Sequence, residues 1–216
     1  MITTNLRERI YTSIFLIFLL FFILIYDVIL VYSLIVLGTF SVIEFFNIIN
    51  KIIKKKLYGI IINISFYIYI FIFCILFFLL LNFSFFKLTL LILLTGSISS
   101  DLGGYIFGKI FKGPKLTNIS PNKTIAGAIG SIFLTYLSVS ILFYYLMNIS
   151  GYKILFLSLI LSLTCQLGDL FFSILKRKAK IKDTGNILPG HGGILDRIDG
   201  ILFSIPSGFL TLILIH

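Results

Sequence analysis

Charged residues are scarce in this chain. Only 12% of its 216 residues are Asp, Glu, Lys or Arg, while 59% are hydrophobic, which excludes the usual balance of a water-soluble domain. Cysteine is nearly absent as well: Cys74 and Cys165 lie in separate apolar stretches, without the spacing of a zinc site or a disulfide framework. We interpret both cysteines as small apolar packing residues. The sequence also contains no internal repeat, low-complexity linker or soluble domain, so we expect a single integral membrane domain over residues 1–216, with the motifs in residues 97–216.

Long apolar stretches recur along the chain, and its mean hydropathy is +1.13. A helix needs about 20 predominantly apolar residues to cross a bilayer, and unpaired backbone in lipid permits only helices or closed barrels. These stretches are too long and too apolar for barrel strands, so we predict an all-α, polytopic bundle of about seven transmembrane helices. The expected spans are Ile10–Tyr26, Val28–Ile49, Leu57–Leu81, Leu88–Phe111, Thr124–Ile149, Ile154–Leu175 and Ile194–Ile215.

The 18 Lys and Arg residues are distributed unevenly between the two ends of these spans. A net charge of +10 would suggest nucleic acid in a soluble protein, but here the sidedness of the charges matters more, and we expect no nucleic-acid partner. All basic residues except Lys87 and Lys153 fall on one side, which by the positive-inside rule is the cytoplasm. This places the N-terminus inside and His216 outside the cell membrane. Because no small-residue cleavage site follows Arg7 and Arg9, we interpret the first span as an uncleaved anchor.

The eight acidic residues are informative, because a carboxylate inside a span costs about 2.5 to 3.5 kcal/mol unless it faces a partner or an ion. Asp101 and Asp169 fall within or near the cytoplasmic halves of the fourth and sixth spans. Helical spacing places Asp169 on one stripe with an amide, a hydroxyl and two cations. The stripe consists of Gln166, Asp169, Ser173, Lys176 and Arg177. A structural ion pair needs only one acid and one base, so we interpret the stripe as part of a functional site.

The seventh span opens with Asp196, Arg197 and Asp199, and its two aspartates stand one helical turn apart. Paired carboxylates at this spacing suit a divalent cation. The glycine-rich segment 189–193 before them predicts a helix N-terminus that phosphate can approach through bare backbone amides. His191 lies in this segment. Taken alone, a histidine in such a loop more often makes a local hydrogen bond than acts as a catalyst.

Two further elements surround the end of the fourth span. Gly104 and Gly108 share the face of Asp101, which fits a functional surface and fits equally the small-residue packing common in membrane helices. The loop that follows contains Ser120 and Lys123. We expect Ser120 to cap the next helix beside a second anion site.

The residues of the C-terminal half together resemble the signature of the phosphatidate cytidylyltransferase family. The likeness covers residues 173–199, and it extends to Asp169 and to the two elements around the end of the fourth span. One departure is that Ile125 and Ala126 stand where the family usually has an aromatic residue and often a glutamate. The signature positions are Ser173, Lys176, Arg177, Lys182, Asp183, Gly185, Pro189, His191, Gly192, Gly193, Asp196, Arg197 and Asp199.

The resemblance implies nucleotidyl transfer, in which a phosphatidate oxygen attacks the α-phosphorus of CTP and pyrophosphate leaves. It implies that Asp169 and Asp196 hold Mg²⁺ with Asp199 nearby, that K⁺ shares this centre, and that the protein forms a homodimer. Lys176 and Arg177 join the two aspartates as expected catalytic residues. The residues expected to bind substrate or phosphate are Ser120, Lys123, Ser173, Lys182, His191, Arg197 and Asp101.

Other readings of these residues remain open. The basic run 176–182 is also explained by topology and by attraction to anionic lipid headgroups. Intramembrane Asp101 and Asp169 fit an ion transporter, although the polar groups cluster at one membrane face instead of several depths. Among enzymes, a CTP-dependent polyprenol or dolichol kinase is the nearest alternative.

Overall fold

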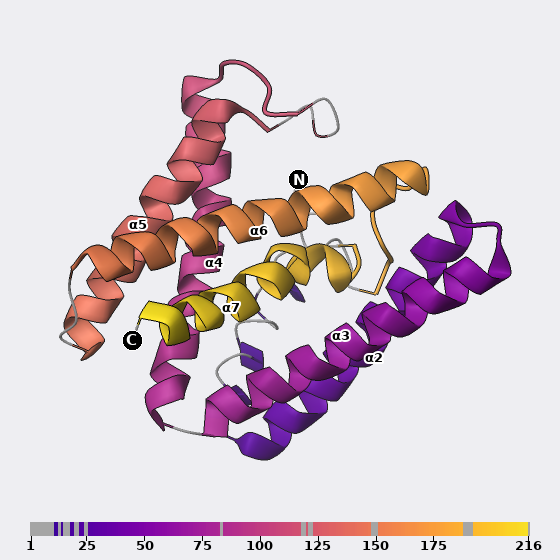
Figure 1. Ribbon diagram of the computed structural model, residues 1–216, viewed down its shortest axis with the longest axis horizontal. Coiled ribbons are helices and arrows are strands. Elements are labelled where there is room, and N and C mark those ends of the chain that lie inside the picture. The colour runs from indigo at the N-terminus through magenta and orange to yellow at the C-terminus, as the bar shows by residue number, and fades with distance from the viewer. Residues whose placement is uncertain are drawn as a thin grey trace. The chain divides into compact units, whose positions relative to one another are not determined.

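A computed structural model describes residues 11–12, 14, 18–19, 22–23, 26–82, 84–117, 120, 123–147, 151–187 and 192–215 of the protein. The named elements of this part of the chain are all α-helices, joined by loops (Figure 1). The helices are α2 (Asp27–Ile52), α3 (Lys56–Asn82), α4 (Ser84–Phe111), α5 (Ile125–Met147), α6 (Tyr152–Lys178) and α7 (Leu195–Ile215).

These helices confirm the expected all-α, polytopic fold. Among the described residues, six helices are long and apolar enough to cross a membrane. They correspond to the second through seventh expected spans, so the chain is an integral membrane protein. The first expected span, Ile10–Tyr26, falls for the most part outside the described residues.

The chain forms two compact units, whose boundaries fall within α3, α6 and α7. Unit 1 comprises Met1–Phe78 and Leu175–Ile198, and unit 2 comprises Leu79–Ile174 and Asp199–His216. In unit 1, α2 packs against α3. Phe45 stacks on Phe66 with ring centroids 3.7 Å apart.

Unit 2 owes its closest helix contact to glycines on α4 and α5, which lie side by side (Figure 1). A Cβ atom on Gly103 would lie 2.5 Å from the carbonyl oxygen of Gly130, and one on Gly130 would lie 2.3 Å from the Cβ of Phe107. A Cβ on Gly104 would come within 2.9 Å of the Ser131 hydroxyl. Small residues therefore allow these two backbones to touch, as the packing interpretation of the fourth span predicted.

Hydroxyl groups connect α6 and α7 with α4 inside unit 2. Each pair forms a hydrogen bond between two helices. Lipid gives no hydrophobic driving force for helix association, so such hydrogen bonds help to hold membrane helices together. The pairs are Ser97–Ser204 at 2.7 Å, Ser100–Ser162 at 3.1 Å and Thr164–Ser207 at 2.7 Å.

Gly130→Ala is expected to destabilise the protein, because the added methyl group must displace the Phe107 ring from the α4–α5 contact. Overpacking of this kind costs about 1 to 3 kcal/mol, which should lower the midpoint of thermal unfolding in detergent. Gly59→Ala is the matched control: Gly59 lies in α3 with nothing within 4 Å of the added Cβ, and alanine favours the helix. Equal midpoints for Gly130→Ala and the wild type would contradict this account of the packing.

Candidate functional site

Lys176 owes its position to the way in which α6 ends. The helix continues to Lys178, past the expected end at Leu175. It closes with Lys180 in the left-handed conformation (φ 56°), while the Ile181 amide donates to the Lys176 carbonyl at 3.0 Å. This is the Schellman arrangement, which stops a helix and turns the chain sharply. Lys176 is therefore held in a rigid helical turn instead of a loose basic loop.

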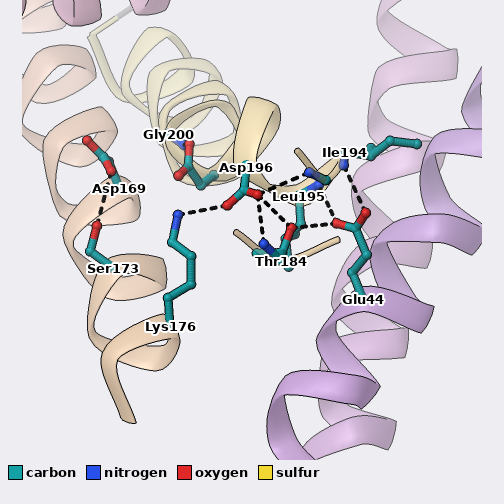
Figure 2. A network of polar contacts seen from close by, with 11 residues as sticks. Glu44, Asp169, Ser173, Lys176, Thr184, Ile194, Leu195, Asp196 and Gly200 are labelled. Carbon is teal, nitrogen blue, oxygen red and sulfur yellow. Dashed lines mark hydrogen bonds and ion pairs between the residues drawn. The ribbon is translucent and has the colours of Figure 1, made fainter. Parts of the chain in front are cut away.

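Lys176 forms an ion pair with Asp196 at the start of α7 (Figure 2). The ammonium nitrogen lies 2.8 Å from Asp196 Oδ1, and the two side chains are 16% and 8% exposed. The second carboxylate oxygen, Oδ2, accepts from the Thr184 amide at 2.8 Å and from the Gly193 amide at 3.1 Å. The Thr184 hydroxyl lies 3.1 Å from the same oxygen. Asp196 thus binds the chain at Thr184 and at Gly193, on either side of the residues that the structure does not describe.

The amides before α7 have protein carboxylates as partners. Asp196 reaches back three residues to Gly193, as an acidic residue does in a capping box. The amides of Ile194 and Leu195 donate to Glu44 of α2, at 3.0 and 2.8 Å. The sequence predicts phosphate at this helix N-terminus. The structure gives these three donors acceptors from within the chain, and carboxylates suit the positive end of the helix dipole just as phosphate does.

Glu44 was not singled out from the sequence. It is only 2% exposed, and besides the Ile194 and Leu195 amides it accepts a hydrogen bond from the Thr184 hydroxyl at 2.7 Å (Figure 2). A carboxylate inside an apolar helix needs a partner, so the sequence could have indicated Glu44 by its place in α2, on the same face as the buried Ser41 and Ile48. Its partners lie about 140 to 150 residues further along the chain, so no local pattern could name them.

Asp169 is at the centre of a second polar cluster, within unit 2. It forms an ion pair with Lys123, and Ser173 one helical turn below donates to Asp169 Oδ1 at 3.4 Å. The Lys123 and Asp169 side chains are 25% and 32% exposed. Asp101 of α4 interacts electrostatically with both of them, and it accepts a weak hydrogen bond from Cys165 at 3.6 Å. The structure therefore brings together residues that three separate motifs had indicated.

Lys123 is held by a hydrogen-bonded loop between α4 and α5. Lys115 pairs with Thr124 in an isolated antiparallel bridge, the Leu116 amide donates to the Lys123 carbonyl at 2.8 Å, and the Lys123 amide donates to Ser120 at 3.0 Å. The expectation that Ser120 caps the next helix is wrong. The α5 helix begins at Ile125, and its cap is Thr124, whose hydroxyl accepts from the Gly127 amide at 3.1 Å, the usual N-cap bond.

Comparison with known proteins identifies the family. The sequence matches the Cytidylyltransferase family over residues 3–215. The chain belongs to this family. Among similar curated proteins are the phosphatidate cytidylyltransferases of Staphylococcus aureus (strain COL), 46% identical over 119 residues, and of Helicobacter pylori, 44% identical over 113 residues. The first alignment covers 54% of this chain and 45% of the relative, and the second covers 51% and 42%, so the chain matches about half the length of these relatives.

The remaining predicted residues of this cytidylyltransferase-family chain are placed as follows. Arg177, in the last turn of α6, and Lys182, which follows the helix, are exposed. Arg197 is also exposed, on the first turn of α7. The Asp199 carboxylate accepts from the Gly200 amide at 2.9 Å, in unit 2. His191 and residues 188–190 before it lie outside the described residues.

The carboxylates suit a divalent cation in their chemistry. In the part of the chain that the structure describes, no group of three or more His, Cys, Asp or Glu residues is placed to hold a metal ion. Asp169 and Asp196, however, each already hold one cation, the ammonium group of Lys123 or Lys176. Carboxylate oxygens are the donor type that Mg²⁺ prefers, so these aspartates have the right chemistry for this ion, although no described group is arranged around one.

Proposed function

We propose that this chain is a phosphatidate cytidylyltransferase, which transfers CMP from CTP to phosphatidate and so makes CDP-diacylglycerol for phospholipid biosynthesis. The observation that supports this best is the identity of 44 to 46% to the two curated proteins of that name, within a family match that spans residues 3–215. The proposed reaction breaks one phosphoanhydride bond. A phosphatidate oxygen bonds to the α-phosphorus of CTP, and pyrophosphate leaves with the electron pair.

The two lysine–aspartate clusters supply the charges that this chemistry needs. Both substrates are polyanions, so most of the barrier lies in bringing phosphates together and in stabilising the charge on the leaving pyrophosphate. Lys176 sits in a turn that the Schellman motif fixes, and Lys123 sits in a loop that backbone hydrogen bonds fix. We assign both ammonium groups to phosphate, with Ser120, Ser173 and the exposed Arg177, Lys182 and Arg197 as further phosphate contacts.

We assign Asp169, Asp196 and Asp199 to Mg²⁺, with K⁺ as an additional cation. Bound Mg²⁺ would neutralise phosphate charge and polarise the reacting phosphoryl group. The chain's own contribution is to orient the carboxylates: Ser173 orients Asp169, whereas Thr184 and Gly193 orient Asp196. Asp101, which interacts with Asp169 and Lys123, would hold that pair in place.

We further propose that the N-terminus and the basic loops face the cytoplasm, where CTP is available, and that the protein is a homodimer. The orientation rests on the charge asymmetry, because only Lys87 and Lys153 of 18 basic residues fall on the opposite side. The dimer rests on the family resemblance alone.

The reaction is tested with purified protein, phosphatidate, Mg²⁺ and CTP labelled at either the α or the γ phosphate. We expect the α label in a chloroform-soluble product and the γ label in water-soluble pyrophosphate. Transfer of the γ label to lipid would contradict the proposal and would identify a CTP-dependent lipid kinase. Cation flux through liposomes without CTP turnover would favour the transporter instead.

A further inference from the structure

We propose that Glu44 is a positioning residue, which holds the Thr184 loop and the first turn of α7 so that Asp196 faces Lys176. The inference rests on the proposed function for its kinetic part only. Glu44 lies in α2, far from the signature in sequence, and its carboxylate accepts three hydrogen bonds from the segment that precedes and begins α7. All of these groups belong to unit 1.

The burial of Glu44 shows how strongly it is bound to this segment. A carboxylate that is 2% exposed inside an apolar helix is costly unless hydrogen bonds satisfy it. Within the described residues, its partners are the amides of Ile194 and Leu195 and the hydroxyl of Thr184, and no Lys or Arg forms an ion pair with it. The start of α7 thus replaces a counter-ion, because its amides and dipole carry the compensating positive charge.

Two glycines of the signature make room for this carboxylate. A Cβ on Gly185 would lie 2.6 Å from Glu44 Oε1, and a Cβ on Gly193 would lie 2.5 Å from Glu44 Oε2 and 2.1 Å from the Thr184 hydroxyl. Only glycine leaves the space for Glu44 at these two places. In this structure, the two signature glycines therefore leave the space that the Glu44 carboxylate occupies.

Thr184 transmits the position of Glu44 to Asp196. The Thr184 hydroxyl lies 2.7 Å from Glu44 Oε2 and 3.1 Å from Asp196 Oδ2, while its amide donates to the same Asp196 oxygen at 2.8 Å. Asp196 Oδ1 then meets Lys176 at 2.8 Å. A chain of short contacts therefore leads from α2 to the ion pair, although Glu44 itself does not touch Lys176 (Figure 2).

The first test is hydrogen exchange in lipid nanodiscs and is independent of catalysis. In Glu44→Gln and Glu44→Leu, the amides of Thr184, Gly193, Ile194 and Leu195 should exchange at least about tenfold faster than in the wild type, because their acceptors are removed or displaced. Ser41→Ala is the matched control, since Ser41 is buried on the same face of α2 and, among the residues the structure describes, its hydroxyl donates to the carbonyl of Leu37. Unchanged exchange in Glu44→Leu would overturn the inference, whatever the protein catalyses.

The second test separates positioning from a simple loss of folded enzyme. Outer partners of catalytic groups typically contribute about 10- to 100-fold, so we expect Glu44→Gln to lower kcat/KM for CTP by this factor with a raised KM. Glu44→Asp, which keeps the carboxylate on a shorter stem, should lie between Gln and wild type. A Vmax that falls only in proportion to the amount of folded enzyme, with kcat per folded molecule and KM both unchanged, would contradict a positioning role.

The outcomes of the two tests also keep this inference apart from the proposed function. If the wild-type protein fails to convert CTP, the proposed function fails, and the exchange experiment still decides whether Glu44 holds the loop. If the wild type is active and the Glu44 variants match it in KM and kcat, the inference alone fails.

Discussion

Asp196→Asn is expected to lower CTP turnover by about 10²- to 10³-fold while the helices still insert in the membrane. One carboxylate oxygen accepts from the amides of Thr184 and Gly193, and the other accepts from Lys176. The Asn side chain keeps one acceptor oxygen but replaces the other with an NH₂ donor. Either the Lys176 ammonium or the Thr184 and Gly193 amides then face a donor instead of an acceptor. The variant also removes the negative charge assigned to Mg²⁺. The measurement is formation of labelled CDP-diacylglycerol across a Mg²⁺ titration.

Asp27→Asn is the control for this variant. Asp27 is the first residue of α2 and lies outside every motif, so the same chemical change there should leave turnover unchanged. Equal amounts of both variants in the membrane fraction show that insertion is intact. Near-normal turnover of Asp196→Asn would refute both its assignment to the metal and its place among the catalytic residues.

Asp169→Asn and Lys123→Met are each expected to lower turnover by a similar factor, about 10²- to 10³-fold. The ion pair between these residues admits a purely structural explanation, in which breaking the pair leaves one uncompensated charge in a partly buried place. The double variant distinguishes the two explanations. Removing both charges together is often close to neutral for stability, so a structural pair should regain its activity in the double variant.

We expect the double variant to remain as inactive as either single variant while it unfolds at a temperature close to that of the wild type. The reason is that Lys123 is assigned to phosphate and Asp169 to the cation, and neither function survives neutralisation. The loop around Lys123 should persist, because backbone hydrogen bonds from Leu116 and Lys123 itself hold it. Recovery of turnover in the double variant would show that the pair is structural.

Whether the sequence could indicate a site residue depended on how far away in the chain its partners lie. Asp101, Lys123 and Asp169 come from three motifs and interact within unit 2, as expected of charges that need partners in a membrane. Glu44 remained undetected because its partners are distant in sequence. The expected cap at Ser120 is wrong because Ser and Thr are both common N-cap residues, and only the structure shows that α5 begins after Thr124, which is bridged to Lys115.

The sequence by itself predicted the helices of the described part of the chain, the membrane as their solvent, and the acids and bases to which we assign the chemistry. Hydropathy and the helical repeat are local quantities, so a window of one span is enough to read them. Only the tertiary structure decided which groups meet: Lys176 with Asp196, Lys123 with Asp169, and Glu44 with the first amides of α7. The physical reason is that a buried charge is stabilised by whatever donor packing brings within hydrogen-bond distance, and packing depends on the whole chain.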